Sequence, residues 1–216
     1  MTTTTTLLLA SGNADKLREL RELCADLPLT VRGPEDLPGG LPAVEETGST
    51  FAANAILKAR AAAAAAASVW PGAWALADDS GLCVDALDGA PGVRSARFAG
   101  VEGPGRDAAN NALLLERLAG VPPERRGAVF RCALVVADAE RIVAAVGHGV
   151  RGRILEAPEG EGGFGYDPLF YHEELGATFA ALTPEEKAAV SHRGIAMRSL
   201  REVLADLLGV EERPVP

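Results

Sequence analysis

Cysteine, histidine and long apolar segments are all scarce in this 216-residue sequence. The three cysteines are widely spaced and form no CxxC motif, which argues against a disulfide framework or a zinc knuckle and favours reduced thiols in a cytoplasmic protein. The three histidines show neither HxH nor HExxH spacing, so no histidine-rich zinc site is expected. The longest uncharged stretch, residues 61–77, is mostly alanine and is interrupted by Pro71-Gly72, so no membrane-spanning helix is predicted.

Positive charge is scarce as well. Lys and Arg total 21 against 30 Asp and Glu, which gives a net charge of −9 and argues against non-specific binding to nucleic acid or to an anionic membrane. A content of 48% hydrophobic and 24% charged residues is typical of a globular domain. The opening MTTTTT has no basic region and no cleavage pattern, so we interpret residues 1–6 as a disordered tail and not as a signal peptide.

Hydrophobic periodicity predicts a mixed α/β (or α+β) fold in one domain over residues 7–209, followed by a loose tail over 210–216. Helices are expected over residues 15–27, 50–67, 107–118, 184–189 and 195–208. Strands are expected over residues 7–10, 74–77, 129–137 and 142–150, with 82–87 either continuing the second strand or pairing with it. The short turn at 138–140 indicates an antiparallel hairpin, which excludes a purely parallel sheet.

Familiar nucleotide-binding and hydrolase motifs are absent or misplaced. Residues 160–165 match GxGxxG, but a polar Pro-Glu stretch precedes them and Pro168 follows them, so the strand and helix that a dinucleotide loop needs are missing. The chain has no GxxxxGK[ST] segment. Ser80 lies in DDSGL and not in a GxSxG nucleophile elbow.

The first of four polar clusters follows the first predicted strand. It consists of Ser11, Gly12, Asn13, Ala14, Asp15 and Lys16. A strand, a glycine turn and a helix start would aim backbone N–H groups and the lysine at one point, which is a plausible phosphate cradle. A capped helix with a surface lysine is the alternative.

Two further clusters bring carboxylates. Glu45-Glu46 precede a helix on which Asn54 and Lys58 share a face, and Asp78-Asp79 follow an apolar strand. Two buried, unpaired carboxylates would be costly, and Mg²⁺ would relieve that cost because it prefers one or two protein carboxylates together with phosphates and water. Solvated loop residues are the alternative in both places.

The fourth cluster combines a glycine-rich loop with later basic residues. Its members are Phe164, Gly165, Tyr166, Asp167, Lys187, His192 and Arg193. The glycines would let a flat ligand approach the aromatic ring, and the histidine and arginine offer donors for carbonyl oxygens. A loop anchor and an ordinary helix start are the alternative. Together, the four clusters describe a nucleotide site.

Five segments resemble the signature blocks of the Ham1/RdgB-type inosine triphosphate pyrophosphatase family, also called dITP/XTP or non-canonical purine NTP pyrophosphatases. They are SGNADK after LLLA, EETGSTFAANAILKARA, ADDSGLCVDALDGAPGVRSARFAG, GGFGYDPLF and LTPEEKAAVSHRG. They occur in the family's order from about Leu7 to Leu208. The resemblance implies a homodimer whose protomers have a long mixed sheet and two lobes around a central substrate cleft. It also implies magnesium-dependent hydrolysis of ITP, dITP and XTP to the monophosphate and pyrophosphate, which cleanses the nucleotide pool.

The resemblance also assigns roles to individual residues. Residues 11–16 would bind the triphosphate, and Lys58 would face the phosphates. Asp79 would accept a proton and ligate magnesium, with Glu45 as the other metal ligand. The expected substrate contacts are Ser80, Phe164, Gly165, Tyr166, Asp167, Lys187, His192 and Arg193.

The chemistry suits these residue types. Magnesium and lysines would neutralise phosphate charge, and a carboxylate would orient or deprotonate water. Donors from His192 and Arg193 would satisfy the 6-oxo group of hypoxanthine or xanthine and would oppose the amino group of adenine. Two rivals stay open, namely a house-cleaning pyrophosphatase acting on pyrimidine or modified nucleotides and a nucleotide sensor without catalysis.

Overall fold

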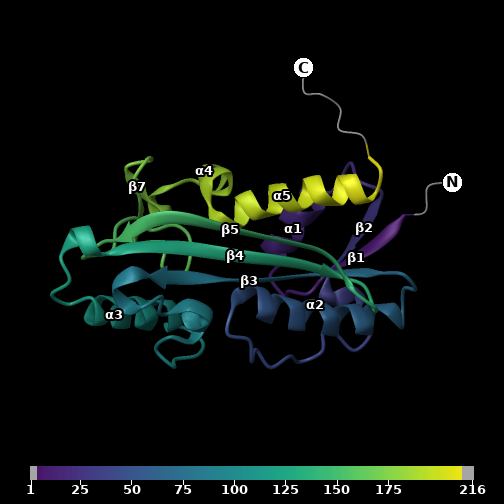
Figure 1. Cartoon of the computed structure of the whole chain (residues 1–216), viewed down its shortest axis with the longest axis horizontal. Coiled ribbons are helices and arrows are strands. Elements are labelled where there is room, and N and C mark those ends of the chain that lie inside the picture. The colour runs from purple at the N-terminus through teal and green to yellow at the C-terminus, as the bar shows by residue number, and fades with distance from the viewer. Residues whose placement is uncertain (1–3, 211–216) are drawn as a thin grey trace, which may run out of the picture. The chain divides into compact units, whose positions relative to one another are not determined.

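The computed structural model describes residues 4–210, which form a mixed sheet with helices on both faces (Figure 1). The strands are β1 (Thr5–Leu9), β2 (Leu29–Arg32), β3 (Trp74–Val84), β4 (Gly127–Ala137), β5 (Ile142–Ile154), β6 (Phe170–His172) and β7 (Ala177–Thr178). The α-helices are α1 (Ala14–Leu23), α2 (Phe51–Ala67), α3 (Arg106–Arg117), α4 (Pro184–Val190) and α5 (His192–Leu207).

The sheet has the order β2-β1-β3-β4-β5-β6-β7. β1 pairs in parallel with β2 and β3, whereas β5–β6 and β6–β7 are antiparallel. β4 and β5 are neighbours joined by a four-residue turn, which only antiparallel strands permit. The predicted hairpin and the predicted mixed sheet are therefore confirmed.

The chain divides into two compact units. Of the described residues, the first unit contains residues 4–79, Ala133–Gly147 and residues 196–210. The second unit contains Ser80–Cys132 and His148–Ile195. Each unit has its own hydrophobic core.

The core of the first unit explains the alanine-rich segment. Alanines of α2 pack against Leu8, Ala75 and Ala77 on one face of the strands, and Thr50 caps the helix by accepting the Ala53 N–H at 3.1 Å. Small side chains on both surfaces let the helix lie close to the sheet. The low-complexity run is therefore an ordinary buried helix face.

The core of the second unit contains a group of aromatic rings among aliphatic side chains. Phe130 lies 4.6 Å from Phe170 and 5.9 Å from Phe179 between ring centres, and Leu114 and Leu118 at the end of α3 belong to the same cluster. All five side chains are nearly or fully buried. This core holds α3 in place, and α3 in turn contacts the loop after β5 at Gly165.

The structure corrects several predicted boundaries. β1 begins at Thr5, so Thr5 and Thr6 belong to the sheet and not to a disordered tail. β3 continues without interruption to Val84, which settles the alternative left open for residues 82–87. The short strands β2, β6 and β7 were not predicted. The rest of both predicted tails, residues 1–3 and 211–216, lies outside the described residues. No helix among the described residues has the length and apolarity to cross a membrane.

Candidate active site

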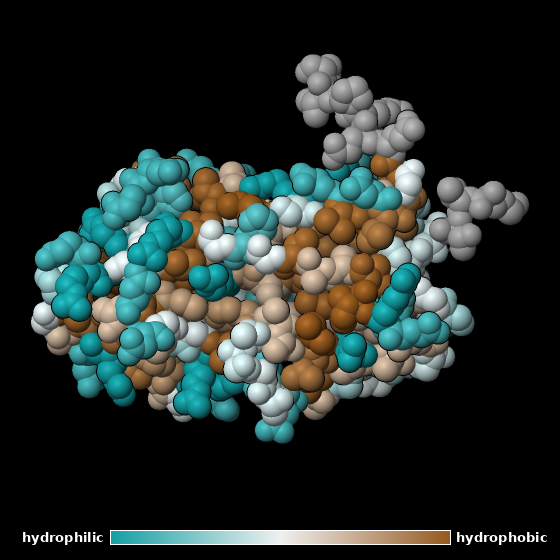
Figure 2. All heavy atoms as spheres, in the orientation of Figure 1, coloured by the Kyte–Doolittle hydropathy of each residue, from teal (hydrophilic) through white to brown (hydrophobic). Residues whose placement is uncertain are grey.

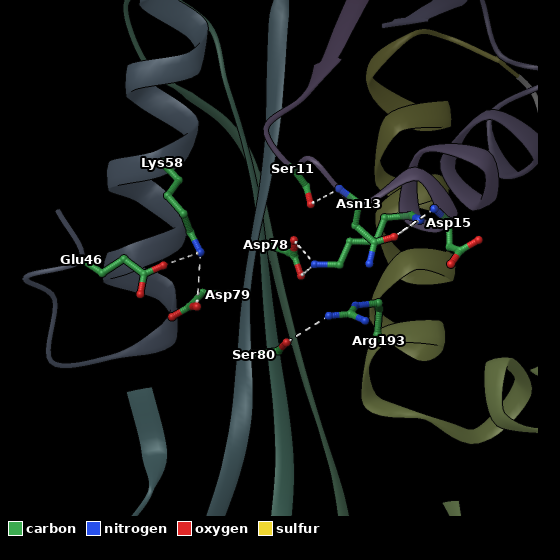
Figure 3. Close-up of polar contacts among 10 residues, drawn as sticks. Ser11, Asn13, Asp15, Glu46, Lys58, Asp78, Asp79, Ser80 and Arg193 are labelled. Carbon is green, nitrogen blue, oxygen red and sulfur yellow. Dashed lines mark hydrogen bonds and ion pairs between the residues drawn. The ribbon is translucent and has the colours of Figure 1, made fainter. Parts of the chain in front are cut away.

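Strand β3 places two neighbouring aspartates on opposite faces of the sheet. Side chains alternate along a strand, so Asp79 follows Ala75 and Ala77 onto the α2 face, whereas Asp78 points to the other face. Figure 3 shows the two carboxylates on opposite sides of β3. Asp78 pairs with Lys16 of α1, and Asp79 pairs with Lys58 of α2. The two aspartates therefore belong to two separate clusters.

Asp79 lies in a cluster that we call the acidic pair, which consists of Glu46 and Asp79 bridged by Lys58. The Lys58 ammonium lies 3.1 Å from the Glu46 carboxylate and 3.3 Å from that of Asp79 (Figure 3). Asn54, one turn before Lys58 on α2, donates its Nδ2 to Asp79 at 3.2 Å. The i, i+4 spacing thus delivers both donors to one carboxylate.

Burial changes the acid–base properties of the acidic pair. Desolvation raises the pKa of Asp79, although Lys58 and the Asn54 hydrogen bond oppose this effect, and the charge of Glu46 adds to it. The pKa of Lys58 is raised, because the attraction of Asp79 and Glu46 outweighs its own desolvation. Asp79 is therefore a carboxylate with increased proton affinity held beside a firmly charged ammonium.

On the opposite face, Lys16 pairs with Asp78. The Lys16 ammonium lies 2.9 Å and 2.8 Å from the two Asp78 carboxylate oxygens, and the side chains are 22% and 9% exposed. An ammonium has three N–H donors, so this pair uses two of them and leaves one for a ligand. The largely buried Asp78 thus holds Lys16 at the N-terminal turn of α1.

The turn between β1 and α1 caps the helix with Asn13. The Asn13 side chain accepts the backbone N–H groups of Asp15 at 2.9 Å and Lys16 at 3.1 Å, and Ser11 Oγ accepts the Asn13 N–H at 3.3 Å. Gly12, Asn13, Ala14 and Asp15 are exposed. The turn therefore presents an open helix N-terminus with a lysine beside it, which suits an anion.

In the second unit, Asp167 organises the glycine-rich loop that we call the aromatic loop, residues 163–167. Its nearly buried carboxylate accepts the Phe164 N–H at 2.7 Å and pairs with Lys187 at 2.5 Å. A side chain at Gly163, which has a φ of +72°, would collide with that carboxylate. Glycine is thus required for Asp167 to reach both partners.

The ring of Phe164 is 60% exposed and has cations near it. The Lys187 ammonium lies 4.4 Å from the ring centre, and the Arg193 guanidinium carbon lies 5.7 Å from it. Arg193 also donates to Ser80 Oγ at 3.2 Å (Figure 3). An exposed aromatic face with fixed donors beside it suits a flat polar ring.

The structure places His192 differently from the other predicted substrate residues. His192 is 8% exposed, and its ring stacks on Phe130 with 4.8 Å between ring centres. Tyr166 is also buried and donates its hydroxyl to the Ser95 carbonyl at 2.9 Å, and burial raises the pKa of that hydroxyl. Both residues are thus built into the second core.

All three lysines of the chain lie in these clusters, each beside a different aspartate. The pairs are Lys16–Asp78, Lys58–Asp79 and Lys187–Asp167. The sequence indicated all three lysines, Asp79 and Asp167 as candidate site residues. It did not single out Glu46 or Asp78 as ion-pair partners, because only the strand pleat and the helix face determine which carboxylate each ammonium meets.

The two neighbouring glutamates, Glu45 and Glu46, have different surroundings. Glu45 is exposed, whereas Glu46 reaches Lys58. The described part of the chain contains no group of three or more His, Cys, Asp or Glu side chains arranged to hold a metal ion. Asp79 and Glu46, which both contact Lys58, are two carboxylates, and Mg²⁺ takes one or two carboxylates from protein when phosphates and water provide the rest.

The structure therefore shows a mixed α/β sheet, with lysine–aspartate pairs suited to anions in the first unit and an exposed aromatic ring flanked by cations in the second. The model of the Ham1 family matches residues 7–203. A relative from Anaeromyxobacter sp. (strain Fw109-5) is 49% identical, over 93% of this chain and 97% of its own length. A relative from Geobacillus kaustophilus is also 49% identical, over 96% and 98%. Both relatives are named dITP/XTP pyrophosphatase.

A solved structure described as a HAM1 protein from Coxiella burnetii is 41% identical and superposes with a TM-score of 0.84, covering 94% of this chain and 99% of that one. The chain therefore belongs to the Ham1 family.

Proposed function

We propose that this chain is a nucleoside triphosphate pyrophosphohydrolase that converts ITP, dITP and XTP to the monophosphate and pyrophosphate. Family membership and the names of the relatives support the reaction class. The observation that carries the proposal is the acidic pair, in which the partly desolvated Asp79 is held by Lys58 and Asn54. A carboxylate with raised proton affinity beside a fixed cation is suited to take a proton from water next to a phosphate.

The reaction needs charge neutralisation as well as a base. Water attacks a phosphorus atom whose oxygens are already negative, so each nearby cation lowers the barrier. In the proposed mechanism, Asp79 accepts the proton of the attacking water, and Lys58 stabilises the charged carboxylate before the transfer. As the new P–O bond forms, the bridging P–O bond between the α- and β-phosphates breaks, and the monophosphate and pyrophosphate separate. Lys16 uses its remaining donor on a phosphate oxygen, and the N-terminal turn of α1 supplies further N–H groups.

We propose Mg²⁺ as the cofactor. The fit rests on the donor set, because Asp79 and Glu46 are oxygen donors that already share one cation, Lys58. When bound, Mg²⁺ would neutralise phosphate charge and polarise the P–O bonds. Asp79 is the proposed first ligand. The family resemblance assigns Glu45 as the second, whereas Glu46 is the glutamate that approaches Lys58 together with Asp79.

The choice between the glutamates can be measured without turnover. Mg²⁺ binding is followed by calorimetry in the presence of a non-hydrolysable triphosphate, for the wild type, Glu45→Gln and Glu46→Gln. If Glu45 is the ligand, Glu45→Gln weakens Mg²⁺ binding and Glu46→Gln changes it little. The reverse result transfers the role to Glu46, and unchanged binding in both variants removes glutamate from the metal site.

Base selection is proposed to lie in the second unit. Phe164 offers a stacking surface, and Arg193, which is fixed by Ser80, offers donors to the 6-oxo group of hypoxanthine or xanthine. Adenine presents an amino donor at that position, so a donor in the protein is left opposed to it. His192 is proposed as the second base contact, although its ring packs against Phe130.

We also propose that the protein is a homodimer in the cytoplasm and uses neither nucleic acid nor membranes as partners. Figure 2 shows hydrophobic side chains gathered over the β4–β5 hairpin, where Ile142, Val143 and Val146 are partly exposed. β5 pairs with β6 only at Arg153 and Ile154. An apolar strand edge of this kind favours association with a second copy. Sedimentation at micromolar concentration tests the homodimer, and a monomeric mass would contradict it.

The experiment that tests the reaction is a substrate panel with product analysis. The protein is incubated with Mg²⁺ and ITP, dITP, XTP, GTP, ATP or CTP, and the phosphorus products are identified by ³¹P NMR. The proposal expects pyrophosphate and the monophosphate from the 6-oxo purines lacking a 2-amino group. Diphosphate plus orthophosphate would contradict the reaction. A preference for CTP would favour the pyrimidine house-cleaning alternative, and binding without turnover would favour a sensor.

A further inference from the structure

Helix α3 binds both backbone polar groups of Gly165, in the middle of the aromatic loop. Asp107 in the first turn of α3 accepts the Gly165 N–H at 2.8 Å, and Asn111 donates its Nδ2 to the Gly165 carbonyl at 2.9 Å. The two side chains are four residues apart and therefore lie on one face of the helix. Gly165 has a φ of +61°, a left-handed conformation that favours glycine.

The residues on either side of Gly165 are the two aromatic residues of the loop. Tyr166 is buried and donates to the Ser95 carbonyl, which also accepts Asn110 Nδ2 at 3.2 Å. Phe164, on the other side, is largely exposed. The loop is therefore fixed to α3 through Gly165 and Tyr166, and only the Phe164 ring projects outward.

The surroundings of Asp107 favour the charged carboxylate that accepts the Gly165 N–H. Burial alone would raise its pKa, but the hydrogen bond from the Gly165 N–H and the neighbouring Arg106 outweigh burial and lower the pKa. Arg106 Nε lies 2.9 Å from the Asp107 carboxylate, which leaves the second carboxylate oxygen for Gly165. A hydrogen bond to a charged acceptor is stronger than one between neutral groups.

We infer that Asp107 and Asn111 are positioning residues that fix the direction of the Phe164 ring and thereby set how tightly the purine ring is held. They would act through the loop and not through contact with the nucleotide. The inference rests on the proposed function for its substrate, because it takes Phe164 as the surface on which the base stacks. It assigns a role in ligand binding to a helix that no predicted substrate residue occupies.

The first test uses the protein without nucleotide. The exchange rate of the Gly165 amide proton is measured by NMR in the wild type, Asp107→Ala and Asp107→Asn. Loss of the charged acceptor should speed Gly165 exchange by about tenfold or more. The conservative Asp107→Asn variant keeps an acceptor oxygen and should recover part of the protection. Glu116→Ala, which removes an exposed charge from the same helix, is the matched control and should leave Gly165 unchanged.

The second test is kinetic and uses a double-mutant cycle. Asp107→Ala and Asn111→Ala should each raise KM for ITP several-fold with little change in kcat, because Asp79 and its donors are untouched. If Asp107 and Asn111 act through the Phe164 ring, adding Asp107→Ala to Phe164→Leu should raise KM for ITP no further. A merely structural role would add the same loss in both backgrounds.

The outcomes separate the inference from the proposed function. Unchanged Gly165 exchange in Asp107→Ala, or an equal loss with and without Phe164, would overturn the inference. Faster exchange together with a KM effect that disappears in Phe164→Leu supports it. Failure of the wild type to hydrolyse either ITP or XTP contradicts the proposed function instead, and the exchange rates still decide whether Asp107 holds the loop.

Discussion

The two units hold their lysine–aspartate pairs in different ways. In the first unit, Lys16 and Lys58 project from helices onto neighbouring positions of β3, so regular secondary structure fixes both pairs. In the second unit, Lys187 reaches Asp167 in a loop that owes its path to glycines and to hydrogen bonds from α3. The first arrangement places both charged pairs on one strand, whereas the second carries an exposed aromatic ring beside the charged pair.

This difference suggests a division of labour. Phosphate chemistry needs charges at fixed positions, which strands and helices supply. Recognition of a base needs an exposed aromatic surface with donors beside it, which the aromatic loop and Arg193 supply. The comparison therefore predicts that variants in the first unit affect all triphosphates alike, and that variants in the second unit change the choice among them.

The largest effect is expected at Asp79. Asp79→Asn keeps the shape and loses the proton acceptor, so kcat for ITP should fall by about 10²- to 10⁴-fold, the usual contribution of a general base. Because desolvation raises the pKa of Asp79, its charged form costs stability, and the variant should melt no lower than the wild type. Pyrophosphate release measures the fall in kcat, and thermal unfolding measures the melting temperature.

A matched control for that variant is Asp85→Asn, which neutralises an aspartate paired with Arg151 at an exposed site. It should retain wild-type turnover. Near-wild-type kcat in Asp79→Asn, or an equal loss in the control, would remove Asp79 from the chemistry.

Lys16 should show a smaller effect that is the same for every nucleotide. Lys16→Ala removes one charged donor, so KM should rise by about 10- to 100-fold for ITP, GTP and ATP alike. It also removes the Lys16 ion pair from the largely buried Asp78, which should lower the melting temperature. Adding Asp78→Asn should restore the melting temperature without restoring KM. A change in the ratio of the KM values for ITP and ATP would contradict the proposed division of labour.

Arg193 should change selectivity. Arg193→Ala removes a donor expected at the 6-oxo group, so kcat/KM for ITP should fall about tenfold or more while that for ATP falls less. His192→Ala should act in the same direction, and its burial against Phe130 makes a stability control necessary. The ratio of kcat/KM for ITP and ATP is the measurement. An unchanged ratio in both variants would return base selection to the aromatic loop.

The smallest effect concerns the three thiols, none of which forms a disulfide. Burial raises the pKa of Cys24 to about 11, with Arg201 opposing and Asp26 adding to the effect, and burial also raises the pKa of Cys83. At pH 8 a thiol reagent should therefore react first with the partly exposed Cys83 and reach Cys24 and Cys132 only in denaturant. Mass spectrometry identifies the sites, and early labelling of Cys24 would contradict its burial.

The same shift has a consequence for stability. The folded chain keeps the Cys24 proton that the unfolded chain loses above pH 9, so this thiol lowers the unfolding free energy as pH rises from about 9 to about 11. Cys24→Ala should flatten that part of the wild-type curve.

Much of the fold could be predicted because its periodicity is strong. The alanine-rich helix, the Asn13 cap and the β4–β5 hairpin all follow from local patterns. The short strands β2, β6 and β7 could not be predicted in the same way, because two to four residues carry too little periodicity. Their pairing depends on neighbouring strands.

The candidate site was predictable in its residue types and less so in its pairings. Lysines and aspartates beside glycine turns are enough to indicate anion chemistry. Which carboxylate each lysine meets depends on the alternation along β3 and on the face of each helix. The roles of Asp107 and Asn111 gave no sequence signal, because their partners are backbone groups 58 and 54 residues away.

The division of labour is tested most directly by inorganic tripolyphosphate, which carries the charge of the substrate without its base. Its inhibition constant against ITP is measured for the wild type, the Lys16→Ala/Asp78→Asn variant and Phe164→Leu. The account predicts weaker inhibition, by about tenfold or more, when Lys16 is removed and no change when Phe164 is removed. Equal weakening in both variants, or weakening only in Phe164→Leu, would contradict it.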